Sequence, residues 1–354
     1  MSPLPADTAP SASTHAPRVA LVYDVLDAFP WRGGDPDDAD AEYEPWATVE
    51  AIEAGLRAAG AEPVRVGTVR DLVAALPTLR ADAAFSIAEG RDGVNREGQA
   101  PTLFEIAGLP FLGADALTMS LSLDKAWTNA VVAAAGVPVP PSVAVASVEA
   151  LDVAMARGAV PPFPVFVKPR FEGSAKGITP ESRCDDAEAL RRATERVTRM
   201  YRQDALVEAF VAGSEFTVAV VGHDPPRALP ALQRAVDVET GIGSHALDRR
   251  GSRGRGADAP EDRPHALPGI LTPDLEERLH ALALTAFDAL RCRDFARMDF
   301  RVTPTGDPVF LEVNPLPTFA PDGTFAILAE LAGEPYDVFL GHLFADALRR
   351  IGVG

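Results

Sequence analysis

The stretch ARMDFRVTPTGDPVFLEVNPLP, residues 296–317, places two carboxylates and an amide inside two runs that otherwise predict apolar β-strands. Thr305-Gly306 is a typical two-residue hairpin turn, and with this turn Asp299 directly faces Glu312 on the opposite strand. Because side chains alternate along a strand, Asn314 shares the face of Glu312. The sequence therefore predicts a polar cluster on one face of a hairpin.

Two carboxylates at cross-strand distance repel each other and are costly to bury. A divalent cation would remove that conflict. Three hard oxygen ligands suit a Mg²⁺ ion that also binds phosphate oxygens, whereas Zn²⁺ prefers His or Cys. The alternative is a solvated strand face on which Arg297 and Arg301 neutralise the acids, and the hairpin alone leaves both interpretations open.

Composition excludes several classes of protein. The chain has 354 residues and a net charge of −18, which argues against a general nucleic-acid or anionic-membrane binder. Two cysteines without metal-type spacing fit a reducing cytoplasm, and no apolar run is long enough to predict a membrane span. The Pro/Ser/Ala-rich start predicts a disordered lead-in over residues 1–17.

Strands alternate with helices in the first part of the chain, which predicts a parallel α/β sheet. The predicted strands are 18–23, 62–67 and 83–87, and the predicted helices are 46–60, 69–76 and 99–108. Further on, strands are predicted at 163–168, 205–210 and 215–222, and helices at 123–136, 185–203, 273–291, 324–333 and 336–350. The aperiodic polar segment 237–264 is a candidate lid.

A second polar motif is PVFVKPRFEGSAKGIT, residues 164–179, in which an apolar strand delivers Lys168 to a glycine-containing loop. The loop contains four residues suited to holding an anion: Gly173, Ser174, Lys176 and Gly177. Glycines let backbone N–H groups converge on phosphate, and the chain has only three lysines, two of them here. This motif predicts a phosphate loop, although glycine turns between strands are common.

A third motif, LVEAFVAGSEFTVAV, ends one strand at Glu208 and opens the next at Glu215. These carboxylates are positioned to accept hydrogen bonds from an adenine amino group and from ribose hydroxyls. Exposed acids at strand ends are also common, so this motif has little weight by itself.

In this order and spacing, the motifs resemble those of the ATP-grasp superfamily, and among its members those of D-alanine–D-alanine ligases. DKAWTNAVVAAAGVPVP, which contains Lys125, and DAAFSIAEGRDGVNREGQAPTLFEIAGLPFLGADALTMSLSLDK extend the similarity to about residues 80–350. The resemblance implies a parallel α/β domain over 18–115, then two α+β subdomains, 116–205 and 206–354, that clamp ATP.

The resemblance also implies roles for individual residues. Lys125, Lys168, Gly173, Ser174, Lys176 and Gly177 are expected to bind ATP phosphates, and Glu208, Phe210, Val211, Glu215 and Leu311 to bind the adenosine. Asp299, Glu312 and Asn314 are the expected ligands of two Mg²⁺ ions, which Mn²⁺ can replace. Arg297, with Ser174 and Lys168, is the expected catalytic group, because Arg297 matches the family arginine that stabilises the acyl-phosphate and the tetrahedral centre.

The reaction implied is ATP-dependent joining of a small-molecule acid to an amine. The substrate region departs from the family, which leaves open whether D-alanine, another amino acid or a natural-product acid is used. The substrate candidates are Glu42 or Glu44, Glu89 in place of a usual histidine, and Thr318, Gly323 and Thr324. A non-catalytic ATP-binding module and a phosphotransferase are the other function classes, and a homodimer is usual in the resembled family.

Overall fold

The first part of the chain forms a small parallel α/β unit, as the sequence predicts. The computed structural model describes residues 15–243 and 265–353. The first sheet has strand order β2-β1-β3 with parallel pairing throughout. Its elements are β1 (Arg18–Tyr23), η1 (Leu26–Ala28), α1 (Trp46–Ala58), β2 (Glu62–Gly67), α2 (Val69–Ala75), β3 (Ala83–Ile87) and α3 (Gln99–Ala107). β1 is the central strand and almost wholly buried, which explains its unbroken apolar run.

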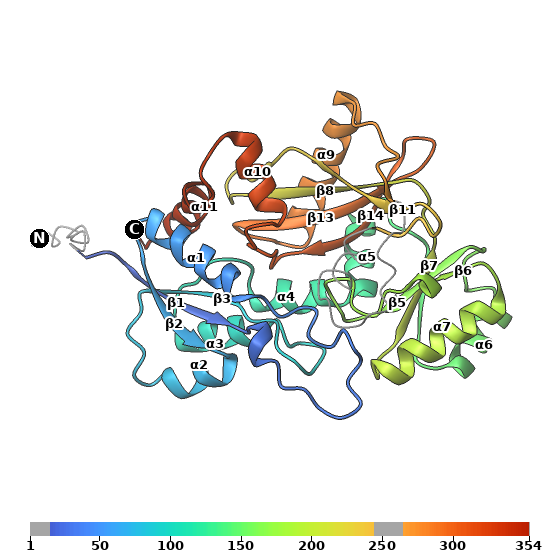
Figure 1. Ribbon diagram of the computed structural model, residues 1–354, viewed down its shortest axis with the longest axis horizontal. Coiled ribbons are helices and arrows are strands. Elements are labelled where there is room, and N and C mark those ends of the chain that lie inside the picture. The colour runs from blue at the N-terminus through green and yellow to red at the C-terminus, as the bar shows by residue number, and fades with distance from the viewer. Residues whose placement is uncertain (1–14, 244–264, 354) are drawn as a thin grey trace, which may run out of the picture.

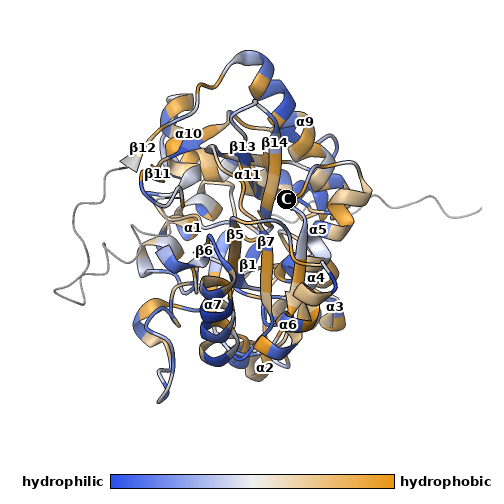
Figure 2. Ribbon diagram, turned by 90° about the vertical axis from the view of Figure 1, so that its right-hand side faces the viewer, coloured by the Kyte–Doolittle hydropathy of each residue, from blue (hydrophilic) through white to orange (hydrophobic). Residues whose placement is uncertain are grey.

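A second, antiparallel sheet carries Lys168 and has strand order β4-β7-β5-β6. The elements of this part are α4 (Ala116–Leu123), α5 (Lys125–Ala134), β4 (Ser142–Val145), α6 (Val148–Ala156), β5 (Val165–Pro169), η2 (Pro180–Ser182), β6 (Arg183–Cys184), α7 (Ala187–Met200) and β7 (Ala205–Ala209). Val165, Val167 and Leu190 are fully buried in its core. Figure 2 shows the contrast between the apolar strand β7 and the largely polar helix α7 that covers this sheet.

A third sheet contains the hairpin and has strand order β10-β8-β13-β14, with β9 paired to β8. Its strands and flanking elements are β8 (Ser214–Val221), β9 (Arg227–Ala228), β10 (Leu232–Arg234), β11 (Val236–Asp237), β12 (His265–Ala266), α9 (Pro273–Ala289), β13 (Phe295–Val302) and β14 (Pro308–Asn314). The apolar face of β13, with Met298 and Phe300, packs with α9 residues such as Leu279. The opposite face of β13 is therefore left for polar side chains.

The last two helices, α10 (Thr324–Ala332) and α11 (Tyr336–Arg350), return to the first sheet (Figure 1). α11 packs against α1 at a distance that only glycine permits. A Cβ at Gly55 would lie 2.6 Å from the Leu340 Cβ, and one at Gly341 would lie 2.8 Å from the Ala58 Cβ. The core of the first sheet therefore includes residues from both ends of the chain.

The hairpin prediction reached the correct pairing through two compensating differences. The turn is not the predicted two-residue turn, because Gly306 N donates to Thr303 O and Thr303 N donates to Asp307 O. The register then shifts once more between Asp299 and Phe300, where Leu311 is the extra residue of a β-bulge. The two shifts cancel, and Asp299 faces Glu312 as predicted.

Other predictions differ in detail or are not tested. The predicted helix 123–136 begins after Asp124, whose side chain accepts from Ala126 N and Trp127 N and so separates α4 from α5. β4, α6 and α4 were not predicted. The domain boundaries after residues 115 and 205 remain proposals. Residues 1–14 of the predicted lead-in and 244–264 of the candidate lid lie outside the described residues. Within the described ranges, no helix combines the length and hydrophobicity needed to cross a membrane.

We predict that Phe295→Ala lowers the free energy of unfolding by about 3–5 kcal/mol, as large cavities in a packed core do. Phe295 is fully buried and its ring lies 5.1 Å from that of Phe319 and 5.6 Å from that of Phe85, so its loss affects both ends of the chain. Urea denaturation measures the change. Leu331→Ala, at an exposed position of α10, is the control and should change stability by less than about 0.5 kcal/mol. Equal effects of the two changes would contradict this account of the core.

Candidate active site

An open cleft of about 700 Å³ lies between the second and third sheets. The second sheet and its loops contribute Phe166, Lys168, Ala175, Ile178, Glu208, Ala209, Phe210 and Val211. The third sheet and its connections contribute Glu215, Ile242, Gly243, Asp299, Arg301, Leu311 and Glu312. We call this the nucleotide cleft, because it brings together most of the residues predicted to bind ATP and adds an apolar wall that suits a purine.

Lys168 and Glu208 form a buried ion pair on neighbouring strands of this cleft. Lys168 Nζ lies 2.9 Å from Glu208 Oε1, and both side chains are about 95% buried. The second oxygen, Glu208 Oε2, is buried with no hydrogen-bond partner in the part of the chain that the structure describes. A buried acceptor without a donor is costly, so the geometry fits a ligand N–H such as the adenine amino group.

Asp299 and Glu312 line the cleft from facing positions on the two strands of the hairpin, and Asn314 lies two residues beyond Glu312 on β14. Arg297 donates two hydrogen bonds to Asp299, at 2.9 and 3.2 Å, and Thr217 Oγ1 donates a third. The Asn314 amide oxygen accepts from the Leu316 N–H at 3.0 Å, which fixes its orientation. Two carboxylates and an amide oxygen form a hard-oxygen set that fits Mg²⁺.

Arg301, for which the sequence suggested only a neutralising charge, also lines the cleft. Its guanidinium lies 3.0 Å from Glu215 and donates to Gly213 O at 3.2 Å. Burial raises the pKa of Glu215, and Arg301 acts in the opposite direction. The alternation of the strand, which puts Arg301 on the face of Asp299, was the signal that could have identified it.

A second cavity, of about 460 Å³, adjoins the nucleotide cleft and shares Glu312 with it. Its lining residues are Glu42, Glu89, Glu97, Ser122, Leu123, Lys125, Gly173, Ser174, Arg297, Glu312, Val313, Asn314 and Pro315. We call it the acidic cavity. It brings the substrate candidates Glu42 and Glu89 together with Arg297 and Ser174.

The other substrate candidates lie outside the lining of both cavities. Glu44 accepts a hydrogen bond from Thr48 at the start of α1. Thr318 bonds to the nearby Ala320 N–H, Gly323 precedes α10, and Thr324 accepts from Arg234 at 2.6 Å. Their predicted roles therefore remain predictions.

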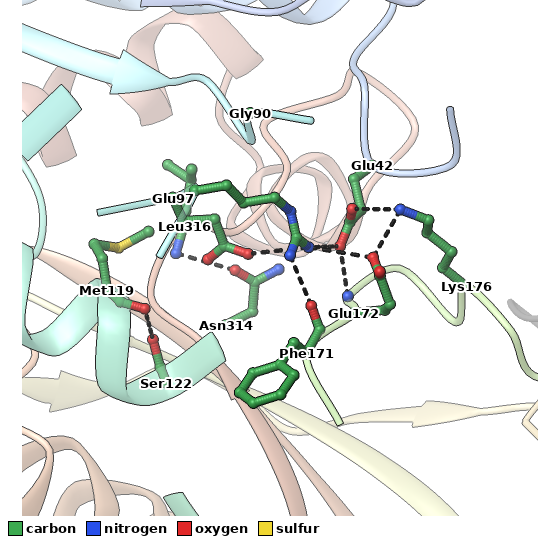
Figure 3. Close-up of polar contacts among 12 residues, drawn as sticks. Glu42, Gly90, Glu97, Met119, Ser122, Phe171, Glu172, Lys176, Asn314 and Leu316 are labelled. Carbon is green, nitrogen blue, oxygen red and sulfur yellow. Dashed lines mark hydrogen bonds and ion pairs between the residues drawn. The ribbon is translucent and has the colours of Figure 1, made fainter. Parts of the chain in front are cut away.

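Glu42 is at the centre of a buried ion network (Figure 3). Its carboxylate pairs with Arg96 at 2.5 Å and Lys176 at 3.3 Å, and accepts from the Gly173 N–H at 2.5 Å. Glu172 pairs with Lys176 at 2.7 Å. Burial would raise the pKa of Glu42, but Arg96 and Lys176 outweigh it and lower that pKa to about 2.

Two other carboxylates of the acidic cavity have the opposite electrostatic balance. Burial and the neighbouring Glu97 raise the pKa of Glu89 well above its usual value. Burial also raises the pKa of Glu97 to about 7, against the attraction of Arg96, which lies 3.8 Å away. An added cation in this cavity would favour the charged form of both groups.

Lys125 lines the acidic cavity and lies close to Glu312, the residue that the two cavities share. It lies at the start of α5, where Asp124 caps the helix and pairs with Arg170 at 2.7 Å. The Lys125 ammonium donates to Glu172 O and lies 3.9 Å from Glu312. Burial lowers the pKa of Lys125, although Glu312 opposes this effect. The ammonium is thus placed beside the predicted metal ligands.

We predict that Glu42→Gln lowers the free energy of unfolding at pH 7 by about 3–5 kcal/mol, because Arg96 and Lys176 lose a buried partner. The ionised Glu42 has a pKa below its unfolded value of 4.5, so its contribution is complete above pH 4.5 and lost as the pH falls towards 2. The difference from wild type should therefore shrink below pH 4.5 in urea titrations run at several pH values. Glu50→Gln, at an exposed position of α1, is the control. A difference independent of pH would contradict this assignment.

Comparisons with known proteins identify the family of the chain. The family model described as D-ala D-ala ligase C-terminus matches residues 131–344. The D-alanine–D-alanine ligase of Desulforudis audaxviator (strain MP104C) is 32% identical over 307 residues, which are 85% of this chain and 92% of that protein. An uncharacterized protein, y4sG of Sinorhizobium fredii, is 30% identical and covers 75% of this chain and 74% of its own length.

Solved structures support the fold. The VanG D-Ala:D-Ser ligase from Enterococcus faecalis aligns with a TM-score of 0.71 and 20% identity, covering 94% of this chain and 100% of that one. The D-alanine–D-alanine ligase from Bacillus anthracis in complex with ATP aligns with a TM-score of 0.67 and 20% identity, covering 95% and 99% of the two chains. The predicted resemblance is confirmed: the chain belongs to the D-alanine–D-alanine ligase family of ATP-grasp proteins, whose members are ATP-dependent ligases that form C–N bonds.

Proposed function

We propose that this chain joins the carboxylate of an ammonium-bearing acid to an amine through an acyl-phosphate made from ATP. The observation that supports this most is the shared wall of the two cavities. Glu312 lines both the nucleotide cleft and the acidic cavity, and Arg297 lines the acidic cavity beside it. A triphosphate that follows the cleft from Glu208 towards Asp299 would end where an acid in the second cavity begins.

Mg²⁺ would be held by Asp299, Glu312 and Asn314, and two ions are expected there. Bound to these oxygens, Mg²⁺ would neutralise phosphate charge and reduce the repulsion that an approaching carboxylate meets. The chain supplies further positive charge through Lys125, which lies 3.9 Å from Glu312. Mn²⁺ has the same preference for oxygen ligands and is the expected substitute.

The proposed reaction has two steps. A carboxylate oxygen of the acid first bonds to the γ-phosphorus as the bond to the β–γ bridging oxygen breaks, and ADP leaves. The nitrogen of the amine then bonds to the acyl carbon, phosphate leaves, and the nitrogen loses a proton. Arg297 is held in place by two hydrogen bonds to Asp299, so its charge can offset the oxyanion that forms in the second step.

The acidic cavity supports an amino acid as the first substrate. Glu42, Glu89 and Glu97 can bring one oxygen each within 4.8 Å of one another, which favours a bound cation such as a substrate ammonium. Curated relatives are named for D-alanine, and we propose a D-amino acid as the first candidate. Other amino acids and a natural-product acid are the alternatives, because Thr318, Gly323 and Thr324 do not line the cavity. Residence in the cytoplasm and a homodimer remain predictions from the sequence.

A non-catalytic ATP-binding module would need Lys168 and Glu208 but not Arg297. The burial of Arg297 against the metal ligands favours an enzyme, since a guanidinium there has no function in holding adenosine. Burial opposes its charge, but Asp299 and Glu312 outweigh burial and raise the pKa of Arg297, so it is a permanent cation.

We predict that ADP release depends on Mg²⁺, an acid and an amine together, and falls at least about 100-fold in Lys168→Ala and in Glu312→Ala. A coupled ADP assay over D- and L-amino acids, alone and in pairs, measures this, and the mass of the product identifies the bond. Glu330→Ala, on the exposed side of α10, is the control and should retain activity. Unchanged ADP release in both variants would end the proposal. A phosphoester product would identify a phosphotransferase, and binding without turnover would identify the module.

A further inference from the structure

The loop between β5 and β6 adopts a backbone that needs external support. Ser174 and Ala175, neither of them glycine, have φ angles of +49° and +56°, in the left-handed region. Consecutive side-chain-bearing residues in this conformation are unfavourable and persist only where surrounding contacts fix them. Ala175 lines the nucleotide cleft and Ser174 lines the acidic cavity, so this is the part of the loop that faces both.

The start of the loop is held by Arg96, which comes from the segment after β3. Arg96 Nη1 donates to Phe171 O at 2.7 Å, and Nη2 lies 2.5 Å from Glu42 and 3.4 Å from Glu172. The guanidinium is about 97% buried. Its planar fork therefore joins the backbone of the loop to a carboxylate of the first α/β unit.

The end of the loop is held by Asp38, which comes from the segment between β1 and α1. Its two oxygens accept from Gly177 N at 2.8 Å and from the Tyr201 hydroxyl at 2.7 Å. Gly177 has a φ of +78°, and a Cβ there would lie 2.4 Å from Pro169 Cγ. The end of the loop is thus pressed against β5, where only glycine fits.

We propose that Asp38 and Arg96 are positioning residues that hold the two ends of the phosphate loop and so set its backbone for the polyphosphate of the nucleotide. This inference rests on the proposed nucleotide site. Neither residue lines the nucleotide cleft or the acidic cavity, so both act through the loop. Glu42 holds the middle of the loop through Gly173 and Lys176 and also faces the acidic cavity.

A competing interpretation predicts the opposite effect on nucleotide affinity. The carboxylates of Asp38 and Glu42 accept hydrogen bonds from loop N–H groups, as a phosphate would. If these carboxylates competed with phosphate, removing one would strengthen nucleotide binding. Support of a left-handed loop predicts weaker binding, and the preorganised backbone is the reason we favour it.

Calorimetric binding of MgADP and of adenosine, without turnover, tests the proposal. Asp38→Ala and Arg96→Met should weaken MgADP binding at least tenfold and change adenosine binding less than twofold, because adenosine lacks the polyphosphate that the loop is proposed to hold. Asp38→Asn keeps an acceptor for the Gly177 N–H and should recover most of the MgADP affinity. Arg96→Lys keeps the charge without the fork and should recover only part.

Two control variants match these changes. Asp35→Ala removes a carboxylate from the same segment as Asp38. The Asp35 carboxylate accepts hydrogen bonds from Arg91 and from the Arg32 N–H, and not from the loop. Arg350→Met removes a guanidinium that donates hydrogen bonds to the Asp294 carboxylate and to Phe111 O. Arg96 likewise donates to a carboxylate, that of Glu42, and to a backbone oxygen, Phe171 O. Both should leave the ratio of MgADP to adenosine affinity unchanged.

Equal weakening of both ligands in the Asp38 and Arg96 variants would overturn the proposal, as would unchanged or tighter MgADP binding. Absence of MgADP binding by the wild-type chain would overturn it as well. Failure of the proposed function is distinguishable, because a chain that binds MgADP through the supported loop yet forms no amide would contradict only the ligase reaction.

Discussion

Asp299 and Glu312 face each other across β13 and β14, and the rest of the site depends on how their like charges are compensated. Arg297 binds Asp299 from the same strand, whereas Lys125 approaches Glu312 from α5, which precedes the second sheet in the chain. Asp299 is buried and Glu312 is partly buried, so unpaired charge on either is costly, and cations from separate elements lie beside them at one point. That point is where the nucleotide cleft meets the acidic cavity, so the electrostatic requirement of the hairpin also determines where two ligands can meet.

Local patterns predicted much of this arrangement. Alternation along β13 identified the polar face that carries Arg297 and Asp299, and apolar runs identified the strands that deliver Lys168 and Glu208. These features depend on neighbours in sequence, so a period of two is enough to find them. The pairing of Asp299 with Glu312 was also predicted, but from a turn that the chain does not use. The β-bulge at Leu311 restores the predicted pairing, and no simple pattern in the sequence predicts such a bulge.

The supports of the site were not predictable in the same way. Arg96 and Phe171 are 75 positions apart and Asp38 and Gly177 are 139 apart, so their contacts exist only once the first α/β unit meets the second sheet. Glu42 and Glu44 were both substrate candidates, in a segment that lacks the usual family pattern. Only the fold distinguishes them, because Glu42 lines the acidic cavity whereas Glu44 accepts a hydrogen bond from Thr48 at the start of α1. The strands that line the cleft follow from short-range patterns, whereas Arg96, Asp38 and Glu42 reach the loop through long-range contacts, which explains why the strands could be predicted and these supports could not.

The close packing of α1 against α11, in which Gly55 faces Leu340 and Gly341 faces Ala58, has a consequence for biosynthesis. α1 leaves the ribosome long before α11, and until α11 has been synthesised the apolar surface of the first sheet lacks the helix that covers it. Nascent chains generally fold from the N-terminus, but here the core around α1 is completed only when α11 is present. A chain truncated before α11 would thus expose an apolar surface, and chaperones and proteases recognise such species.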